Sequence, residues 1–333
     1  MASFEALQSA WYGTRHAPWW AWPLSATYGG IVRLRMALYR RRWLQGVRLT
    51  VPVVVIGNLT VGGTGKTPLT IAVVEALLAR GYHPGVVSRG YGGTQQAPLL
   101  LPDAPAPALV GDEPCLIRAS GVPVAVGRDR PAAAQLLVDA GCDVVVADDG
   151  LQHYALSRDV EVCVIDGVRR FGNRHMLPAG PLREPLARLS RVDFRVCNGG
   201  SPQHGEYAME LVTGEAVALV DGHCLSLQCF AGERVHGVAA IGNPQRFFNS
   251  LRAAGIEVAE HAFADHHRYL SADLDFDDQQ PVLMTDKDAV KCRAFAQPHW
   301  WCVPVRAQLS QEFFDALVRR IEAARQGSGP RVS

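Results

Sequence analysis

The residues best suited to chemistry lie at positions 60–67, which read Thr-Val-Gly-Gly-Thr-Gly-Lys-Thr. They follow an apolar run at 51–56 and precede a helix-forming segment at 68–80, the context of a phosphate-binding P-loop. Glycines let backbone N–H groups converge on an anion, and the start of the following helix adds positive potential. The stretch therefore predicts a nucleoside triphosphate site. The expected contacts are Thr60, Val61, Gly62, Gly63, Thr64, Gly65, Lys66 and Thr67.

Two residues at the end of this loop carry the expected chemistry. Lys66 supplies a mobile charge for phosphate oxygens, and the Thr67 hydroxyl is suited to ligate magnesium. Only 3 of the 33 basic residues are lysine, so a lysine at this position indicates a requirement for a compact ammonium. Thr60 departs from the general pattern, which has glycine there. The alternative is a glycine-rich turn that merely joins a strand to a helix.

Asp148 and Asp149 end the apolar run at 144–147. P-loop proteins place a magnesium-organising carboxylate at the carboxyl end of a buried parallel strand, so both are expected near Mg²⁺. Adjacent side chains on a strand point in opposite directions. We therefore expect one acid to face the nucleotide and the other to cap a helix or hold a neighbouring residue.

Two further motifs contain possible proton acceptors. Asp112 lies in Gly-Asp-Glu-Pro and is either a helix N-cap or a carboxylate beside the transferred phosphoryl group. The sequence Asp-His-His at 265–267 lacks a third metal ligand at suitable spacing. A histidine of this motif better suits a base for a sugar hydroxyl, paired with a carboxylate across a cleft between domains.

Two Gly/Pro-rich loops carry arginine and suit anion recognition. Arg89 lies in the loop at 88–93, and Arg183 precedes Glu184 in the loop at 178–185. A rigid loop can present the planar guanidinium to phosphate oxygens. Either loop is alternatively a structural turn with a solvated arginine.

The overall composition is that of a globular protein with more than one domain. The chain has 333 residues, 48% hydrophobic and 20% charged. A net charge of +1 provides no global field for nucleic acid, so no nucleic-acid partner is expected. Its eight cysteines lack paired metal spacing and are interpreted as free thiols in a reducing compartment. The N-terminus lacks the pattern of a signal peptide.

Residues 1–49 form a segment of unusual composition. Positions 1–50 hold seven arginines, one acid and five of the seven tryptophans. Indole favours the membrane–water interface and arginine favours anionic headgroups, so this segment predicts a helical, peripheral membrane contact. A helix at 31–44 would have one stripe for lipid and one for protein, while 17–32 makes a poor spanning helix. The alternative is a helical pair packed on the domain with solvated arginines.

Strand-like and helix-like segments alternate after this region, which predicts an α/β fold with a P-loop NTPase-like parallel sheet. We expect this kinase domain to span residues 50–205. A β-hairpin connector is expected at 206–233 and a second, smaller α/β domain at 234–326. Residues 327–333 are expected to be a frayed tail.

Taken together, these motifs resemble the tetraacyldisaccharide 4′-kinase family over nearly the whole chain. The motifs lie at 58–68, 88–93, 111–114, 148–153, 178–185, 242–244, 265–267 and 285–288. The family shares the loop that begins with Thr60. Two departures are Ala264, where proline is usual, and Asp286, where glutamate is usual.

The resemblance implies transfer of the ATP γ-phosphoryl group to the 4′-hydroxyl of a tetraacyldisaccharide 1-phosphate, forming lipid IVA in lipid A biosynthesis. It implies a peripheral protein at the cytoplasmic face of the bacterial inner membrane, whose acylated substrate stays in the bilayer. Lys66 and Thr67 would serve the triphosphate and magnesium, and Asp112 with His266 would handle the hydroxyl proton. Asp148, Asp149, Arg183 and Glu184 would organise ions and phosphate.

Two other functions fit the motifs less completely. One is a P-loop kinase for a different amphiphile or a small sugar. The other is a nucleotide-switched ATPase or GTPase that recruits a partner to the membrane, which would leave Asp112 and His266 without a role.

Overall fold

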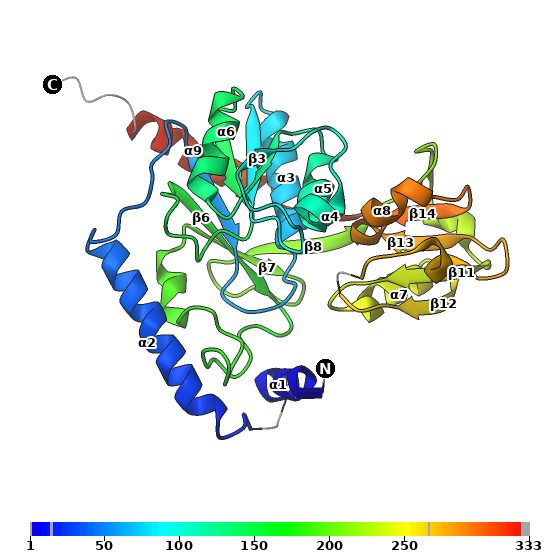
Figure 1. Cartoon of the computed structure of the whole chain (residues 1–333), viewed down its shortest axis with the longest axis horizontal. Coiled ribbons are helices and arrows are strands. Elements are labelled where there is room, and N and C mark those ends of the chain that lie inside the picture. Colours follow the sequence, from blue (N-terminus) through cyan, green and yellow to red (C-terminus); the bar gives the residue numbers. More distant parts are fainter. Residues whose placement is uncertain (1, 14–15, 266, 328–333) are drawn as a thin grey trace.

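The computed structural model describes residues 2–13, 16–265 and 267–327. Within them, the strands form a sheet of nine and a sheet of six (Figure 1). The larger sheet has the order β15-β8-β7-β6-β1-β5-β2-β4-β3, and its strands from β8 to β4 are parallel. The predicted α/β class is confirmed. Its strands are β1 (Val53–Gly57), β2 (Pro84–Ser88), β3 (Leu99–Leu100), β4 (Val124–Val126), β5 (Val144–Ala147), β6 (Val160–Asp166), β7 (Phe194–Asn198), β8 (Tyr207–Thr213) and β15 (Val305–Leu309).

Burial on both faces explains the continuous apolar runs of the central strands. In β1, Val54 and Ile56 join one apolar cluster, and Val53 and Val55 join the other. The first cluster contains side chains of α3 (Lys66–Leu78), α5 (Asp112–Arg118) and α9 (Gln311–Gly327). The second contains side chains of α6 (Arg130–Asp139). Alternate residues therefore contact helices on opposite faces, as expected for a covered parallel sheet.

The smaller sheet and its helices form a second α/β unit beside the first, at the right of Figure 1. Its order is β10-β9-β14-β13-β11-β12, with β14, β13, β11 and β12 parallel. Its strands are β9 (Ala216–Ala218), β10 (Cys224–Leu225), β11 (Arg234–Ala239), β12 (Glu257–Ala262), β13 (Val282–Thr285) and β14 (Trp300–Val303). The remaining helical elements are α4 (Pro107–Val110), α7 (Pro244–Ala253), α8 (Asp286–Cys292), η1 (Leu186–Arg191), η2 (Leu227–Phe230), η3 (Ser271–Leu274) and η4 (Arg293–Phe295).

The predicted hairpin at 206–233 is wrong. Its two strands join different sheets: β8 pairs with β7 and β15, whereas β9 pairs with β10 and β14. The predicted second domain at 234–326 also extends too far. Strand β15 returns to the larger sheet, and Phe313, Leu317 and Ile321 of α9 are buried in its core. The apolar face of α9 thus belongs to the first sheet, which sequence order alone does not reveal.

The N-terminal segment contains α1 (Ala2–Tyr12) and α2 (Ala21–Arg40). Helix α2 is continuous through Pro23, Gly29 and Gly30, so it begins earlier than the predicted helix at 31–44. Its inner face buries Ser25 and Gly29, while Ile31 and Leu34 are each 61% exposed. Among the described residues, no helix has the length and apolar content to cross a membrane.

Candidate active site

The phosphate-binding loop joins the carboxyl end of β1 to α3. Gly62 has φ +109° and Gly65 has φ +89°, backbone conformations that favour glycine. A Cβ on Gly65 would lie 2.6 Å from Nδ2 of Asn198. Gly65 is the N-cap of α3, and Lys66 is its first residue. The glycines in the motif are therefore required by the path of the chain as well as by an incoming anion.

Neighbouring segments hold the loop on two sides. The backbone N–H of Val61 donates to the carbonyl of Pro181 at 2.9 Å, and that of Arg183 donates to the carbonyl of Leu59 at 2.7 Å. On the other side, Asn198 Nδ2 donates to the carbonyl of Thr64 at 2.9 Å. The loop at 178–185 is therefore a structural support of the phosphate-binding loop. Asn198 at the end of β7 was missed by the sequence reasoning, because a lone asparagine after a strand carries no specific signal.

Asp148 and Asp149 point to different partners, as their adjacency predicts. Asp148 is almost fully buried and accepts a hydrogen bond from Thr70 Oγ1 of α3 at 2.9 Å. Burial, together with the nearby charges of Glu113 and Asp149, raises the pKa of Asp148 to about 6. The structure thus holds this carboxylate against α3, directly behind the loop.

Asp149 faces the cationic residues of the site. Its Oδ1 lies 3.7 Å from Lys66 Nζ, and its Oδ2 lies 3.1 Å from Arg183 Nη1. Burial alone would raise the pKa of Asp149, but Lys66 and Arg183 outweigh it and hold this pKa below its usual range. Asp149 also has φ +47°, a rare conformation for a residue with a side chain. Such strain is characteristic of functional sites.

Arg130 supports the strained backbone at Asp149. It begins α6, is 4% exposed, and its Nη1 donates to the Asp149 carbonyl at 3.1 Å. Sequence reasoning missed it, because an arginine at the start of a surface helix usually extends into solvent. Its burial follows from the position of α6 beside the ends of β2 and β4.

The motif at 111–114 brings two carboxylates to the start of α5. Gly111, with φ +92°, is the N-cap of this helix, so the N-cap interpretation of Asp112 is wrong. Asp112 is 9% exposed, and its Oδ2 lies 3.7 Å from Lys291 Nζ of α8. Glu113 accepts a hydrogen bond from Lys287 Nζ of α8 at 2.6 Å.

The charge of Glu113 interacts with the phosphate-binding loop as well as with α8. Burial alone would raise its pKa, but Lys287 outweighs burial and lowers it, and Lys66 adds to this effect. Because Glu113 also affects Asp148, the carboxylate lies within the field of the phosphate-binding loop. The sequence reasoning gave the function of this motif to Asp112 alone. The signal for Glu113 was its place in the same first helical turn.

His266, the predicted partner of Asp112, lies outside the described residues. Its neighbour Asp265 contributes to the raised pKa of Lys287, which places the Asp265 carboxylate within the field of α8. His267 lies 3.1 Å from Asp273 through Nε2 and stacks on Phe263. The pairing of Asp112 with His266 therefore stays a prediction.

Arg89 lines a surface hollow of about 400 Å³ together with Arg128 and residues 90–96. The side chain of Arg89 is exposed, and its positive charge adds to the effect of burial in lowering the pKa of Arg130. Arg89 follows β2, and Asp149 follows its parallel neighbour β5, so both lie at the carboxyl edge of the sheet. A positively charged hollow there suits a phosphorylated or strongly hydrogen-bonding ligand.

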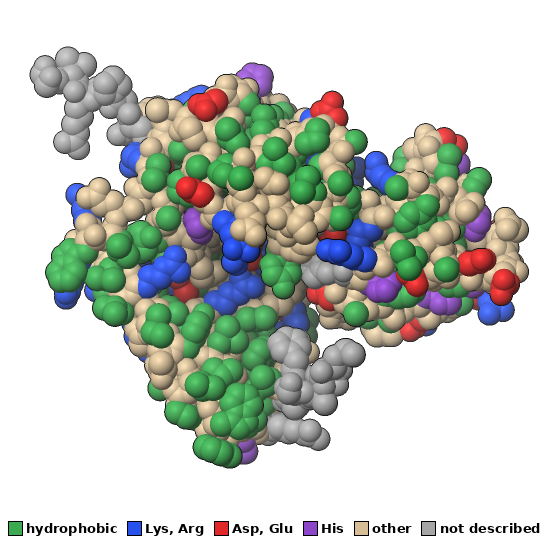
Figure 2. All heavy atoms as spheres, viewed as in Figure 1, with side chains coloured by type: hydrophobic (Ala, Val, Ile, Leu, Met, Phe, Trp, Pro, Cys, Tyr) green, Lys and Arg blue, Asp and Glu red, His purple; other side chains and the backbone are tan. Residues whose placement is uncertain are grey.

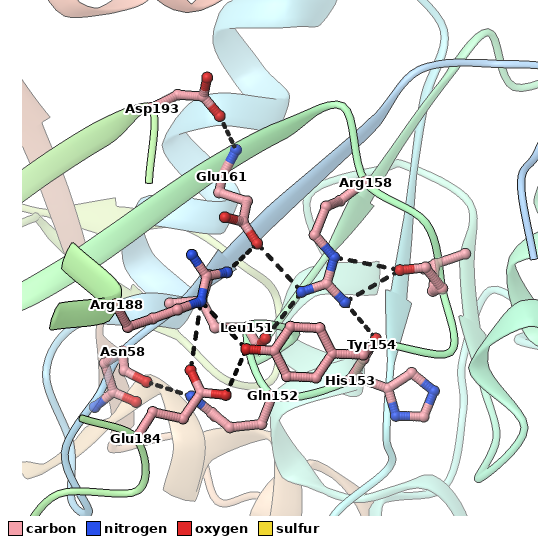
Figure 3. Close-up of polar contacts among 11 residues, drawn as sticks. Asn58, Leu151, Gln152, His153, Tyr154, Arg158, Glu161, Glu184, Arg188 and Asp193 are labelled. Atoms are coloured by element: carbon pink, nitrogen blue, oxygen red, sulfur yellow. Dashed lines mark hydrogen bonds and ion pairs between the residues drawn. The ribbon is translucent and has the colours of Figure 1, made fainter. Parts of the chain in front are cut away.

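Glu184 lies in a buried polar network behind the loop (Figure 3). It accepts a hydrogen bond from Tyr154 Oη at 2.7 Å, and its Oε2 lies 3.7 Å from Arg188 Nε. Arg188 in turn bonds Glu161 of β6. In the same view, Gln152 donates to the carbonyl of Asn58, just before the loop. Glu184 is therefore held by Tyr154 and Arg188 in this network, and its predicted role toward ions and phosphate stays a prediction.

The residues present fit a nucleotide with magnesium. Within the described part of the chain, the buried Thr64 Oγ1 has no hydrogen-bond partner, as expected for a loop shaped around an anion. The searched residues contain no cluster of three or more His, Cys, Asp and Glu side chains able to hold a metal. Magnesium commonly takes one or two carboxylates plus substrate phosphates, so Asp148, Asp149 and Thr67 suffice.

A parallel sheet with this loop, its lysine and acids on the neighbouring strand defines a P-loop phosphotransferase class of protein. The family model described as tetraacyldisaccharide-1-P 4′-kinase matches residues 17–322. The chain belongs to the tetraacyldisaccharide-1-P 4′-kinase family.

Relatives with the name tetraacyldisaccharide 4′-kinase match almost the whole chain. That of Stenotrophomonas maltophilia is 51% identical over 326 residues, covering 95% of this chain and 96% of its own. That of Xylella fastidiosa strain M23 is 50% identical over 323 residues, covering 94% and 95%. The crystal structure of LpxK from Aquifex aeolicus, an "apo" form in complex with ATP, has a TM-score of 0.75. It is 25% identical and covers 90% of this chain and 98% of its own.

Proposed function

We propose that this protein transfers the γ-phosphoryl group of ATP to the 4′-hydroxyl of a tetraacyldisaccharide 1-phosphate, forming lipid IVA in lipid A biosynthesis. The observation that carries the proposal is the contact of Lys66 with Asp149 at the phosphate-binding loop, with Arg183 on the same carboxylate. This arrangement collects the charges that phosphoryl transfer needs. The names of the relatives supply the acceptor.

The donor phosphates are bound by residues 60–67, with Lys66 neutralising the oxygens of the transferred group. Asp148, Asp149 and the Thr67 hydroxyl are the residues that would hold Mg²⁺. When bound, this ion neutralises charge on the β- and γ-phosphate oxygens. Arg183 orients Asp149, and Thr70 orients Asp148. These contacts keep the site ordered before the nucleotide binds, which lowers the cost of binding.

The acceptor hydroxyl loses its proton to Asp112, with His266 as its partner. Asp112 lies at the start of α5, one residue before Glu113, whose charge reaches the loop. Lys291 and Lys287 of α8 contact these two acids, so the helix beside the second sheet is tied to the start of α5. Arg89 and the hollow beside it bind the polar part of the acceptor.

The N-terminal segment holds the protein at the cytoplasmic face of the inner membrane, as a peripheral protein. Figure 2 shows hydrophobic side chains gathered over the α2 side of the molecule, at lower left, beside basic side chains, and the basic residues of the N-terminal segment are all arginine. Trp19 is 83% exposed and Trp43 is 72% exposed, at the two ends of this region. Exposed indoles near arginines suit a bilayer interface. The acyl chains of the acceptor can then stay in the membrane during the reaction.

The test is incubation of the purified full chain with γ-labelled ATP, Mg²⁺ and a tetraacyldisaccharide 1-phosphate, with the products separated by chromatography. The proposal is supported if a labelled bis-phosphorylated lipid forms, and forms only when the acceptor is present. Release of labelled inorganic phosphate at the same rate without acceptor would instead indicate a nucleotide-switched hydrolase.

A further inference from the structure

The carboxyl end of α1 packs on the segment that supports the phosphate-binding loop. Trp11 is 3% exposed, and its Nε1 donates to the Pro178 carbonyl at 2.9 Å. Its own carbonyl accepts from the backbone N–H of Asn173 at 2.8 Å. A Cβ on Gly172 would lie 2.4 Å from the same carbonyl, so the approach is close. Helix α1 is therefore fixed to the chain just before Pro181, which pairs with Val61 of the loop.

The next residue of α1, Tyr12, contacts Arg169, which in turn contacts the phosphate-binding loop. The Arg169 guanidinium lies 5.4 Å from the centre of the Tyr12 ring, a cation–π distance. Its Nη2 donates to the carbonyl of Gly63 at 2.8 Å, and its Nε donates to Asp166 Oδ2 at 2.7 Å. The Tyr12 hydroxyl lies 3.5 Å from the carbonyl of Val61.

These contacts reach the most adaptable part of the loop. Gly62 has φ +109°, and a Cβ there would meet only Arg169 Nη1, at 3.8 Å, while a Cβ on Gly63 would meet no atom within 4 Å. Glycine loses much conformational freedom when a loop becomes ordered. A fixed donor on the Gly63 carbonyl orders the loop in advance and turns carbonyl oxygen away from an incoming phosphate. Asp166 neutralises the charge of Arg169. Arg169 therefore contributes to the phosphate-binding loop mainly by fixing its backbone geometry.

We propose that Tyr12 and Arg169 are positioning residues for the phosphate-binding loop, through which α1 contributes to nucleotide affinity. The inference rests on the proposed function of residues 60–67 as the ATP site. It gives the N-terminal segment a second role, because the end of the chain that carries the exposed tryptophans also orders the loop. The acceptor site is not part of this linkage, since Arg89 and Asp112 lie on other elements.

The test compares Tyr12→Ala and Arg169→Ala with Tyr12→Phe, which keeps the ring under the guanidinium. Gln8→Ala is the control on the same helix, where the side chain is exposed. In the full chain, Tyr12→Ala and Arg169→Ala should raise the KM for ATP about three- to tenfold, because an unordered loop binds more weakly. The value of kcat at saturating ATP should change less than about twofold, as for a loss of ground-state binding. The KM for the acceptor should stay constant, and Gln8→Ala should match the parent protein. Tyr12→Phe, which loses only the 3.5 Å contact with the Val61 carbonyl, should raise the KM for ATP less than Tyr12→Ala does.

Binding of a fluorescent ATP analogue without acceptor gives a second measurement. Weaker binding in both alanine variants, with thermal midpoints near the parent value, supports the inference. Unchanged binding in Tyr12→Ala, or a parallel rise of the KM for both substrates, overturns it. Lys66→Ala separates this failure from that of the proposed site. If Lys66→Ala binds the analogue normally, the proposed ATP site itself is wrong.

Discussion

Lys287 of α8 donates a hydrogen bond of 2.6 Å to Glu113 of α5, and so joins helices that flank different sheets. One turn further along α8, Lys291 lies 3.7 Å from Asp112. With Lys66 beside Asp149, all three lysines of this arginine-rich chain contact carboxylates around one site. Each of these contacts is made by a compact ammonium at the end of a flexible four-carbon chain.

The Lys287–Glu113 pair should stabilise the junction between the two sheets. We expect Lys287→Met to lower the free energy of unfolding in urea by about 1 kcal/mol, because Glu113 loses its partner while partly buried. In a double-mutant cycle with Glu113→Gln, part of this loss should be recovered. The stabilisation should be present above the ordinary pKa of glutamate and fade as the pH falls through the lowered pKa of Glu113. A coupling energy near zero would mean that other contacts hold the junction.

Removal of the Lys66 ammonium should abolish most of the activity without unfolding the protein. Lys66→Ala is expected to reduce kcat by about 10²–10³, the usual effect of losing one preorganised charge contact. Lys66→Arg should restore little, because the larger guanidinium cannot take the place of a compact ammonium among the phosphate oxygens. Steady-state kinetics with saturating acceptor measures both. Turnover close to that of the parent protein in Lys66→Ala would remove Lys66 from the mechanism.

Asp112 should be the residue that accepts the hydroxyl proton. Asp112→Asn keeps the shape of the side chain but cannot take a proton, so kcat should fall by about 10²–10⁴. The matched control is Asp103→Asn, because Asp103 pairs with Arg118 of the same helix but its side chain is 97% exposed. Equal kinetics of the two variants would contradict the assignment.

The outer face of α2 should contact the bilayer. Replacing Ile31 and Leu34 by glutamine removes apolar area from this face, so less protein should float with vesicles that contain phosphatidylglycerol. We expect the bound fraction to fall by about half or more, since each exposed apolar side chain contributes about 1.5–3 kcal/mol when fully buried. Val220→Gln, on an exposed side chain of the other part of the molecule, is the control. Equal flotation of both proteins would disprove the membrane contact of α2.

Several features of this protein could be predicted from the sequence because they are local. The glycines at 62 and 65 and the apolar run of β1 predict the loop and its strand, since backbone conformation and burial act on the residues themselves. The adjacency of Asp148 and Asp149 predicts that they point apart, and the structure agrees. The helical periodicity of residues 31–44 was also visible, and Ile31 and Leu34 of the predicted stripe share an exposed face, whereas the burial of Gly29 was not predicted.

Other features depend on tertiary contacts that no local pattern encodes. Strand β8 pairs with β15, almost 100 residues later, so the predicted hairpin with β9 does not form. Glu113 was overlooked because its partner Lys287 is 174 residues away. Arg130 is buried only because α6 packs against β2 and β4, where its guanidinium reaches the Asp149 carbonyl. The sequence by itself determined the phosphate-binding loop, its strand and its helix, because these depend on neighbouring residues. The tertiary structure decided which distant side chains surround that loop, because only packing brings them together.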